Sequence, residues 1–222
     1  REDPGTTEVR QESLRAFLRD METRPVAPAP LESNRQHYEV PAAFFENILG
    51  PRLKYSACIW PEEELRRRPR SGEAAPEREL LAEAEEAMLR LTAERADVKD
   101  GMRILDLGCG WGAFSLWAAE RFPRAHITAV SHSALQGAFI RERAAEGGLA
   151  NVRAITADMN EFEPPAGSGP FDRIVSVEMF EHMANWPKLL RRVASWLRED
   201  GLFFVHVFAH RELAYPFRQG PR

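Results

Sequence analysis

Residues 104–114 read I-L-D-L-G-C-G-W-G-A-F, so that three glycines occupy every second position directly after an apolar run containing an acid. Apolar side chains then recur at helical spacing at Phe114, Trp117 and Phe122. This pattern predicts a strand, a tight loop and a helix. Glycines allow unusual backbone angles there and let a ligand come close to main-chain atoms. The spacing of the last glycine differs from the G-x-G-x-x-G dinucleotide fingerprint, which disfavours a nicotinamide dehydrogenase.

Strand and helix patterns alternate along the remainder of the chain. The further strands are predicted at residues 126–130, 152–156, 171–177 and 202–207, and the helices at residues 77–97, 133–146 and 186–198. Asn185 is expected to cap the last of these helices, and Asp200 with Gly201 to end it. Five strands joined by helical crossovers predict an α/β fold with a doubly wound, mostly parallel, Rossmann-like sheet.

The N-terminal part of the chain has a different texture, with prolines, charges and aromatic residues. A short helix is predicted within residues 12–21, and it cannot continue past Pro25. We expect three parts, namely a tail over residues 1–33, a helical N-terminal cap over residues 34–98 with a mobile loop at 62–76, and the cofactor-binding α/β domain over residues 99–222.

Composition narrows the class of partner. The 222 residues are 44% hydrophobic and carry a net charge of -4, which gives no general attraction to nucleic acid. No apolar run approaches the roughly 20 residues that cross a bilayer, and no secretory signal is visible, so a cytoplasmic location is expected. Residues 65–70 form a basic cluster, interpreted as a solvated loop, with peripheral contact to lipid headgroups as the alternative. Oligomeric state does not follow from the sequence.

Polar side chains stand where the second and third strands should end. His132 and Gln136 can hydrogen-bond ribose hydroxyls in place of the acid that dinucleotide folds carry there. Asp158 and Met159 suit an adenine, since a carboxylate can accept an amino proton and a thioether can lie on a ring face. The alternative is that Asp158 only caps the following turn.

The fourth strand runs into three ionisable residues, Glu178, Glu181 and His182. Such groups are costly to bury without a purpose, which favours a catalytic cluster over a pair on a surface turn. The two glutamates would share a face if the stretch is helical. A metal site is disfavoured because nothing nearby completes a ligand set. His206 lies on the apolar fifth strand and is either a hydrogen-bonded core histidine or a member of the same cluster.

Four stretches carry a resemblance to a known family. They are Q-H-Y-E-V-P at residues 36–41, L-K-Y-S at residues 53–56, the glycine loop at residues 105–112 and residues 171–183. Together they resemble S-adenosylmethionine-dependent methyltransferases of the branch that contains cyclopropane fatty acid synthases and coclaurine-type N-methyltransferases. The resemblance implies the class I methyltransferase fold and S-adenosylmethionine as cofactor.

The resemblance also implies a role for each matching residue. Tyr38 and Ser56 would contact the methionine end of the cofactor. The other cofactor-binding positions would be Asp106, Gly108 and Gly110 in the glycine loop, His132 and Gln136 at the ribose, Asp158 and Met159 at the adenine, and Val177 on the floor. Glu178, Glu181 and His182 match the residues that position and deprotonate an amine in the N-methyltransferases.

Details of the sequence lean toward N-methylation of a small amine. Ala57 stands where the synthases carry a cysteine, and the residue matching Glu178 is usually small in them. Conversely, Glu181 and His206 match two synthase residues that hold a bicarbonate base, so lipid methyl or methylene transfer is kept as the alternative. A catalytically inactive cofactor-binding scaffold is the third. Family members continue past the fifth strand, so we expect this chain to lack the C-terminal elements that cover the substrate.

Overall fold

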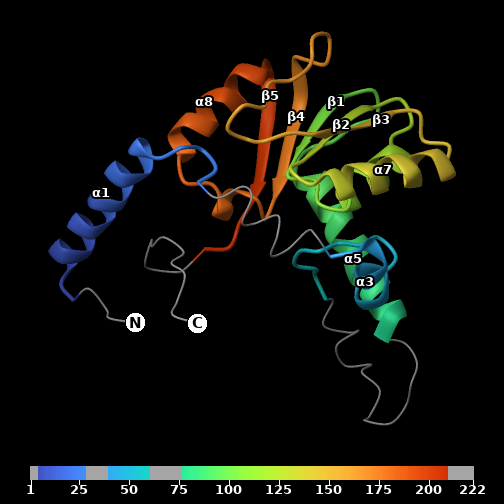
Figure 1. Cartoon of the computed structure of the whole chain (residues 1–222), viewed down its shortest axis with the longest axis horizontal. Coiled ribbons are helices and arrows are strands. Elements are labelled where there is room, and N and C mark those ends of the chain that lie inside the picture. The colour runs from blue at the N-terminus through green and yellow to red at the C-terminus, as the bar shows by residue number, and fades with distance from the viewer. Residues whose placement is uncertain (1–4, 29–39, 61–76, 210–222) are drawn as a thin grey trace.

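The computed structural model of the chain describes residues 5–28, 40–60 and 77–209 (Figure 1). In this part a five-stranded parallel sheet has the order β3-β2-β1-β4-β5. Its strands are β1 (Arg103–Leu107), β2 (His126–Ser131), β3 (Val152–Thr156), β4 (Phe171–Val177) and β5 (Leu197–His206). The order reverses between β1 and β4, which is where such sheets bind ligands beyond the carboxyl ends of their strands. The predicted doubly wound fold is confirmed.

Two layers of helices cover the sheet because successive strand residues point to opposite faces. Ile104 packs against α5 (Glu77–Arg95) and α6 (Ala113–Arg121), on the face that α7 (Ala134–Glu146) also covers through Ile140. Leu105 packs in the opposite core with α8 (Trp186–Trp196). The Asn185 side chain accepts a 3.0 Å hydrogen bond from Lys188 N, so the predicted cap of α8 is confirmed.

The N-terminal helix α1 (Thr7–Thr23) is longer than predicted, and it ends before Pro25 as expected. Its C-terminal end is fixed to the body, where the Asn185 side chain donates hydrogen bonds to the carbonyl oxygens of Glu22 and Arg24. Figure 1 shows the remainder of α1 running outward beyond α8. The next helix, α3 (Ala42–Ile48), is short, and it buries Phe45 against Trp111 of the glycine loop.

The junction between α8 and β5 differs from the prediction. The helix ends at Trp196 and the strand begins at Leu197, so the predicted helix end at residue 198 and the stop at Asp200–Gly201 are wrong. Leu197 pairs with Phe171 and Leu202 with Arg173, which leaves the intervening residues in a bulge. The residues in the bulge are unpaired, and they lie in the strand because the residues on either side pair with β4, which local sequence does not encode.

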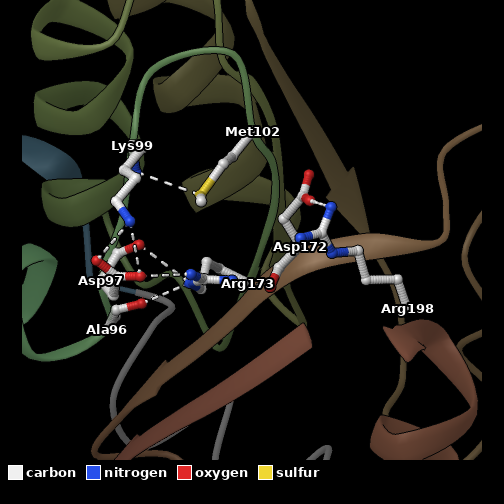
Figure 2. A network of polar contacts seen from close by, with 7 residues as sticks. All are labelled: Ala96, Asp97, Lys99, Met102, Asp172, Arg173 and Arg198. Carbon is white, nitrogen blue, oxygen red and sulfur yellow. Dashed lines mark hydrogen bonds and ion pairs between the residues drawn. The ribbon is translucent and has the colours of Figure 1, made fainter. Parts of the chain in front are cut away.

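The amino ends of the central strands carry a polar network, drawn in Figure 2. The buried guanidinium of Arg173 donates to the carbonyl oxygens of Ala96 and Asp97 at 2.7 and 3.1 Å and pairs with the Asp97 carboxylate at 2.8 Å. Asp172 pairs with Arg198 at 2.7 Å. These contacts tie the end of α5 to β4 at the rim opposite the strands' carboxyl ends.

Some of the features predicted from the sequence lie outside the described residues, namely the basic cluster at 65–70, the loop at 62–76 and Tyr38. Among the residues that are described, no helix combines the length and the apolar character needed to span a bilayer.

Candidate functional site

The glycine loop joins β1 to α6, and its three glycines all have left-handed backbone angles. A Cβ atom on Gly108 would lie 2.7 Å from Met179, and one on Gly112 would lie 2.7 Å from Ile140, so both positions need glycine for close packing. A Cβ on Gly110 would meet nothing within 4 Å. Gly110 therefore faces open space, as a loop that receives a ligand requires.

Asp106 lies directly below this loop and is buried on β1. The Ser115 hydroxyl, on the first turn of α6, donates a 2.6 Å hydrogen bond to its Oδ2 atom. Burial raises the pKa of the Asp106 carboxyl from 3.8 to about 6, against the opposing effects of Ser115 and Lys54. Sequence reasoning missed Ser115, although its place one turn into the helix after the loop could have indicated it.

The end of β2 contains a compact polar group. The Ser131 hydroxyl donates to Gln136 Oε1 at 2.6 Å, and the Ser133 hydroxyl caps α7 by accepting from Gln136 N at 3.3 Å. Within the described residues, the Gln136 Nε2 and His132 Nε2 atoms are buried without a hydrogen-bond partner. Buried polar atoms are rarely left unsatisfied, so these two fit a ligand that carries hydroxyl groups, as predicted for the ribose.

The end of β3 supports the more modest interpretation of Asp158. Its Oδ1 atom accepts a 2.8 Å hydrogen bond from Asn160 N, so the carboxylate does cap the following turn. Met159 is buried in the core beneath α8. The roles of Asp158 and Met159 toward an adenine stay predictions.

Beyond β4, the chain turns sharply at Glu178, which has a left-handed φ of 52°. Its backbone N–H donates to His206 O at 2.7 Å, and its Oε1 atom accepts a 2.8 Å hydrogen bond from Ala57 N. Val177, which precedes it, is half-buried and paired with His206 on β5. A non-glycine residue in this conformation costs energy and is typical of functional sites.

The second carboxylate of the cluster is held in a similar way. Glu181 Oε1 accepts a 2.8 Å hydrogen bond from Phe208 N, just past β5. Of the atoms in the described residues, Glu181 Oε2 and His206 Nδ1 are buried without partners. His182 is exposed in the 3-10 turn η1 (Phe180–His182). Because the chain is helical only over this turn, Glu178 does not share a helical face with Glu181.

Contacts join these strand ends into one region. The backbone N–H groups of Gly108 and Cys109 both donate to Val130 O of β2, at 2.9 and 3.0 Å. Gly108 also packs against Met179, the neighbour of Glu178. The glycine loop thus touches both the end of β2 and the segment that carries the predicted amine-binding residues.

Sequence reasoning also missed the support beneath Ser56. The Ser56 hydroxyl accepts a hydrogen bond from the buried Lys54 ammonium, and the Lys54 backbone N–H donates to the buried carboxylate of Glu85 on α5. These residues come from segments about 30 positions apart, and no local pattern connects them. Across the described residues, no group of three or more His, Cys, Asp or Glu side chains is arranged to hold a metal ion.

Comparison with known proteins gives a consistent result. The family described as mycolic acid cyclopropane synthetase matches residues 28–217. The (S)-coclaurine N-methyltransferase of Thalictrum flavum subsp. glaucum is 39% identical over 182 residues, which make up 82% of this chain and 46% of that protein. The cyclopropane-fatty-acyl-phospholipid synthase of Escherichia coli strain K12 is 29% identical over 180 residues, covering 80% of this chain and 41% of the synthase.

Among solved structures, a crystal structure of coclaurine N-methyltransferase bound to N-methylheliamine and SAH has a TM-score of 0.81 at 33% identity. The match covers 95% of this chain and 56% of that chain. The chain thus spans about half the length of the curated relatives it matches.

Proposed function

The chain belongs to the mycolic acid cyclopropane synthetase family of S-adenosylmethionine-dependent methyltransferases, and on this premise we propose that it N-methylates a small amine. The observation that carries the proposal is the pair of carboxylates at the strand ends. Glu178 and Glu181 are each fixed by one backbone N–H, from Ala57 and Phe208, and so are aimed by main-chain atoms. Two fixed carboxylates suit a substrate that gains positive charge on nitrogen.

The residues present fit the cofactor, because Gly110 faces open space and the Gln136 and His132 nitrogens need partners. When bound, S-adenosylmethionine supplies an electrophilic methyl group on a sulfonium sulfur. The residues that would hold it are Ser56, Asp106, Gly108, Gly110, His132, Gln136, Asp158, Met159 and Val177, together with Tyr38.

In the proposed mechanism Glu178 and Glu181 orient the amine and offset the charge that develops on its nitrogen. An amine attacks only when it is neutral, so its proton must leave. His182 is exposed, so its imidazole can accept that proton and pass it to water. The substrate class is favoured by the higher identity to the N-methyltransferase, 39% against 29% for the synthase.

One observation favours a second candidate, lipid methyl or methylene transfer. Glu181 Oε2 and His206 Nδ1, at positions that match bicarbonate-holding synthase residues, are buried and without partners in the described part of the chain. A bound bicarbonate could satisfy both atoms, and it would then serve as the base.

Methyl-labelled S-adenosylmethionine tests the proposal with coclaurine as one acceptor and unsaturated phospholipid vesicles as the other. We expect label in the amine, and Glu181→Gln and His182→Ala to lower turnover by about 100-fold each, a typical contribution of an acid–base group. Glu199→Gln, exposed on β5, is the matched control. Label in the lipid alone would favour the second candidate. Thermal stabilisation by S-adenosylhomocysteine (SAH), without turnover of any acceptor in a broad panel, would instead indicate an inactive scaffold.

A further inference from the structure

We propose that Lys54 is a positioning residue for Glu178, acting through the hydroxyl of Ser56 and the backbone of Ala57. The inference rests on the proposed function, in which Glu178 is one of the two carboxylates that orient the acceptor. It adds a residue from outside the strand ends to that machinery.

The Lys54 side chain is in an unusual place for an ammonium group. The residue is only 5% exposed, and its Nζ atom donates to Ser56 Oγ and, at 2.8 Å, to Ala57 O. Both acceptors are uncharged oxygens, and neutral partners compensate poorly for the burial of a charge. Burial accordingly lowers the pKa of Lys54. The ammonium group thus holds two neutral oxygens by hydrogen bonds, while the nearby carboxylates of Glu178, Glu85 and Asp106 offset part of the burial.

The two acceptors of Lys54 lie on either side of one backbone donor. That donor is the Ala57 N–H, which makes the 2.8 Å hydrogen bond to Glu178 Oε1. Because the ammonium holds Ser56 Oγ before this N–H and Ala57 O after it, the direction of the N–H is fixed from both sides. Ala57 itself is exposed, so packing of its own side chain does not hold it.

The other end of the same segment is anchored to α5. Glu85, fully buried, accepts hydrogen bonds from the backbone N–H groups of Arg52 at 2.9 Å and Lys54 at 3.2 Å. A Cβ atom on Gly50 would lie 2.4 Å from Glu85 Oε2, so a larger residue there would displace this carboxylate. The segment over residues 50–57 therefore links the helix layer to Glu178.

Glu178 depends on this link more than an ordinary surface glutamate would. Its backbone is already held in a left-handed conformation by the 2.7 Å hydrogen bond to His206 O. With the main chain fixed, the side-chain direction is set by the Ala57 N–H. Lys54 also places a positive charge near Glu178, Glu85 and Asp106, which balances the acidic groups around it.

A double-mutant cycle on the full chain tests the inference, with coclaurine as acceptor. Lys54→Met keeps much of the aliphatic stem and removes the donor. We expect it to lower kcat/KM for the amine by about 10- to 100-fold, and the same change to cost less than about 3-fold when Glu178→Gln is already present, because coupled residues are non-additive. Lys99→Met, in an exposed ion pair with Asp97 at the opposite rim, is the matched control.

The outcomes separate the two proposals. If Glu178→Gln lowers turnover but Lys54→Met costs the same in both backgrounds, only the positioning role is overturned. If Glu178→Gln keeps wild-type turnover, the role of Glu178 in the proposed function fails, and the inference fails with it.

A second measurement needs no turnover. Hydrogen exchange at the Ala57 amide should be at least about 10-fold faster in Lys54→Met, because the acceptor Glu178 is no longer faced by a fixed donor. Thermal melting would check that the variant is folded. Unchanged exchange at Ala57 in a folded variant would overturn the inference.

Discussion

The Ser115 hydroxyl and the Oδ2 atom of Asp106 are joined by a 2.6 Å hydrogen bond beneath the glycine loop. One hydroxyl does not replace the water that a carboxylate loses on burial, and the pKa of Asp106 consequently rises to about 6. The protein thus holds a carboxylate that is costly to ionise beneath the loop that we propose binds the sulfonium cofactor.

The first prediction concerns this cost. An aspartate whose pKa is 3.8 unfolded and about 6 folded makes folding take up a proton between those values, so its contribution to stability is lost as the pH rises through about 6. Asp106→Asn should therefore make the cofactor-free protein more stable than wild type by about 1–3 kcal/mol at pH 7, and by much less near pH 4. Urea denaturation at the two pH values measures this difference.

Asp100→Asn is the control for that experiment. Asp100 lies at the opposite rim, where the hydrogen bond from Arg124 lowers its pKa. Its replacement should give no gain at pH 7. An Asp106→Asn protein that is no more stable than wild type at pH 7 would contradict the prediction.

The second prediction compares two glycines. Gly110 and Gly101 have φ values of 54° and 86°, and a Cβ atom on either would meet nothing within 4 Å. Alanine at either site should cost about 1–2 kcal/mol of stability, the usual penalty of a left-handed backbone. Only Gly110→Ala should also raise the Kd for SAH, by about 10-fold or more, because only Gly110 lies in the loop that we propose contacts the cofactor. Calorimetric titration of SAH into both variants decides it, and equal Kd values would refute the assignment of the loop.

The third prediction concerns the network of Figure 2. The Arg173 side chain is buried and donates to three carbonyl oxygens as well as to the Asp97 carboxylate, whereas Arg198 is half-exposed in its pair with Asp172. Arg173→Met should lower the free energy of unfolding by about 1–3 kcal/mol, because the buried carbonyl oxygen of Ala96 loses its donor. Arg198→Met should cost less than about 1 kcal/mol, as half-exposed ion pairs contribute little. Equal losses in thermal denaturation would show that burial does not set the cost.

Much of the fold could be predicted from local sequence because the central strands are short apolar runs followed by polar residues. Residues 152–156 and 171–177 were predicted with the bounds that the structure gives. The glycine loop could also be predicted from the local sequence. Its left-handed backbone angles favour glycine, which makes the loop visible in the sequence. The apolar run before it predicts that it follows a buried strand.

What could not be predicted depends on contacts between distant segments. Residues 197–201 contain polar and helix-favouring residues, and they lie in the strand because Leu197 pairs with Phe171 and Leu202 pairs with Arg173. The left-handed turn at Glu178 has no sequence signal, since glutamate rarely adopts it without support such as the hydrogen bond to His206. The burial of Lys54 and Glu85 could not be predicted, because isolated charged residues are ordinarily solvated. Their burial follows from the packing of α5.

The strand order also has a consequence for the order in which the strands pair during folding. Arg103 pairs with His126, whereas Ile104 pairs with Arg173, three times as far along the chain. Closing the longer loop costs more entropy, so we expect β1 and β2 to associate first during refolding, with amides of β2 protected in pulse labelling before those of β4. The glycine loop would then form before the segment that carries Glu178 and Glu181 joins the sheet. A cofactor that contacts both the β1–β2 pair and the end of β4 would bind only after β4 has joined the sheet. Its binding would therefore stabilise the product of the last folding step.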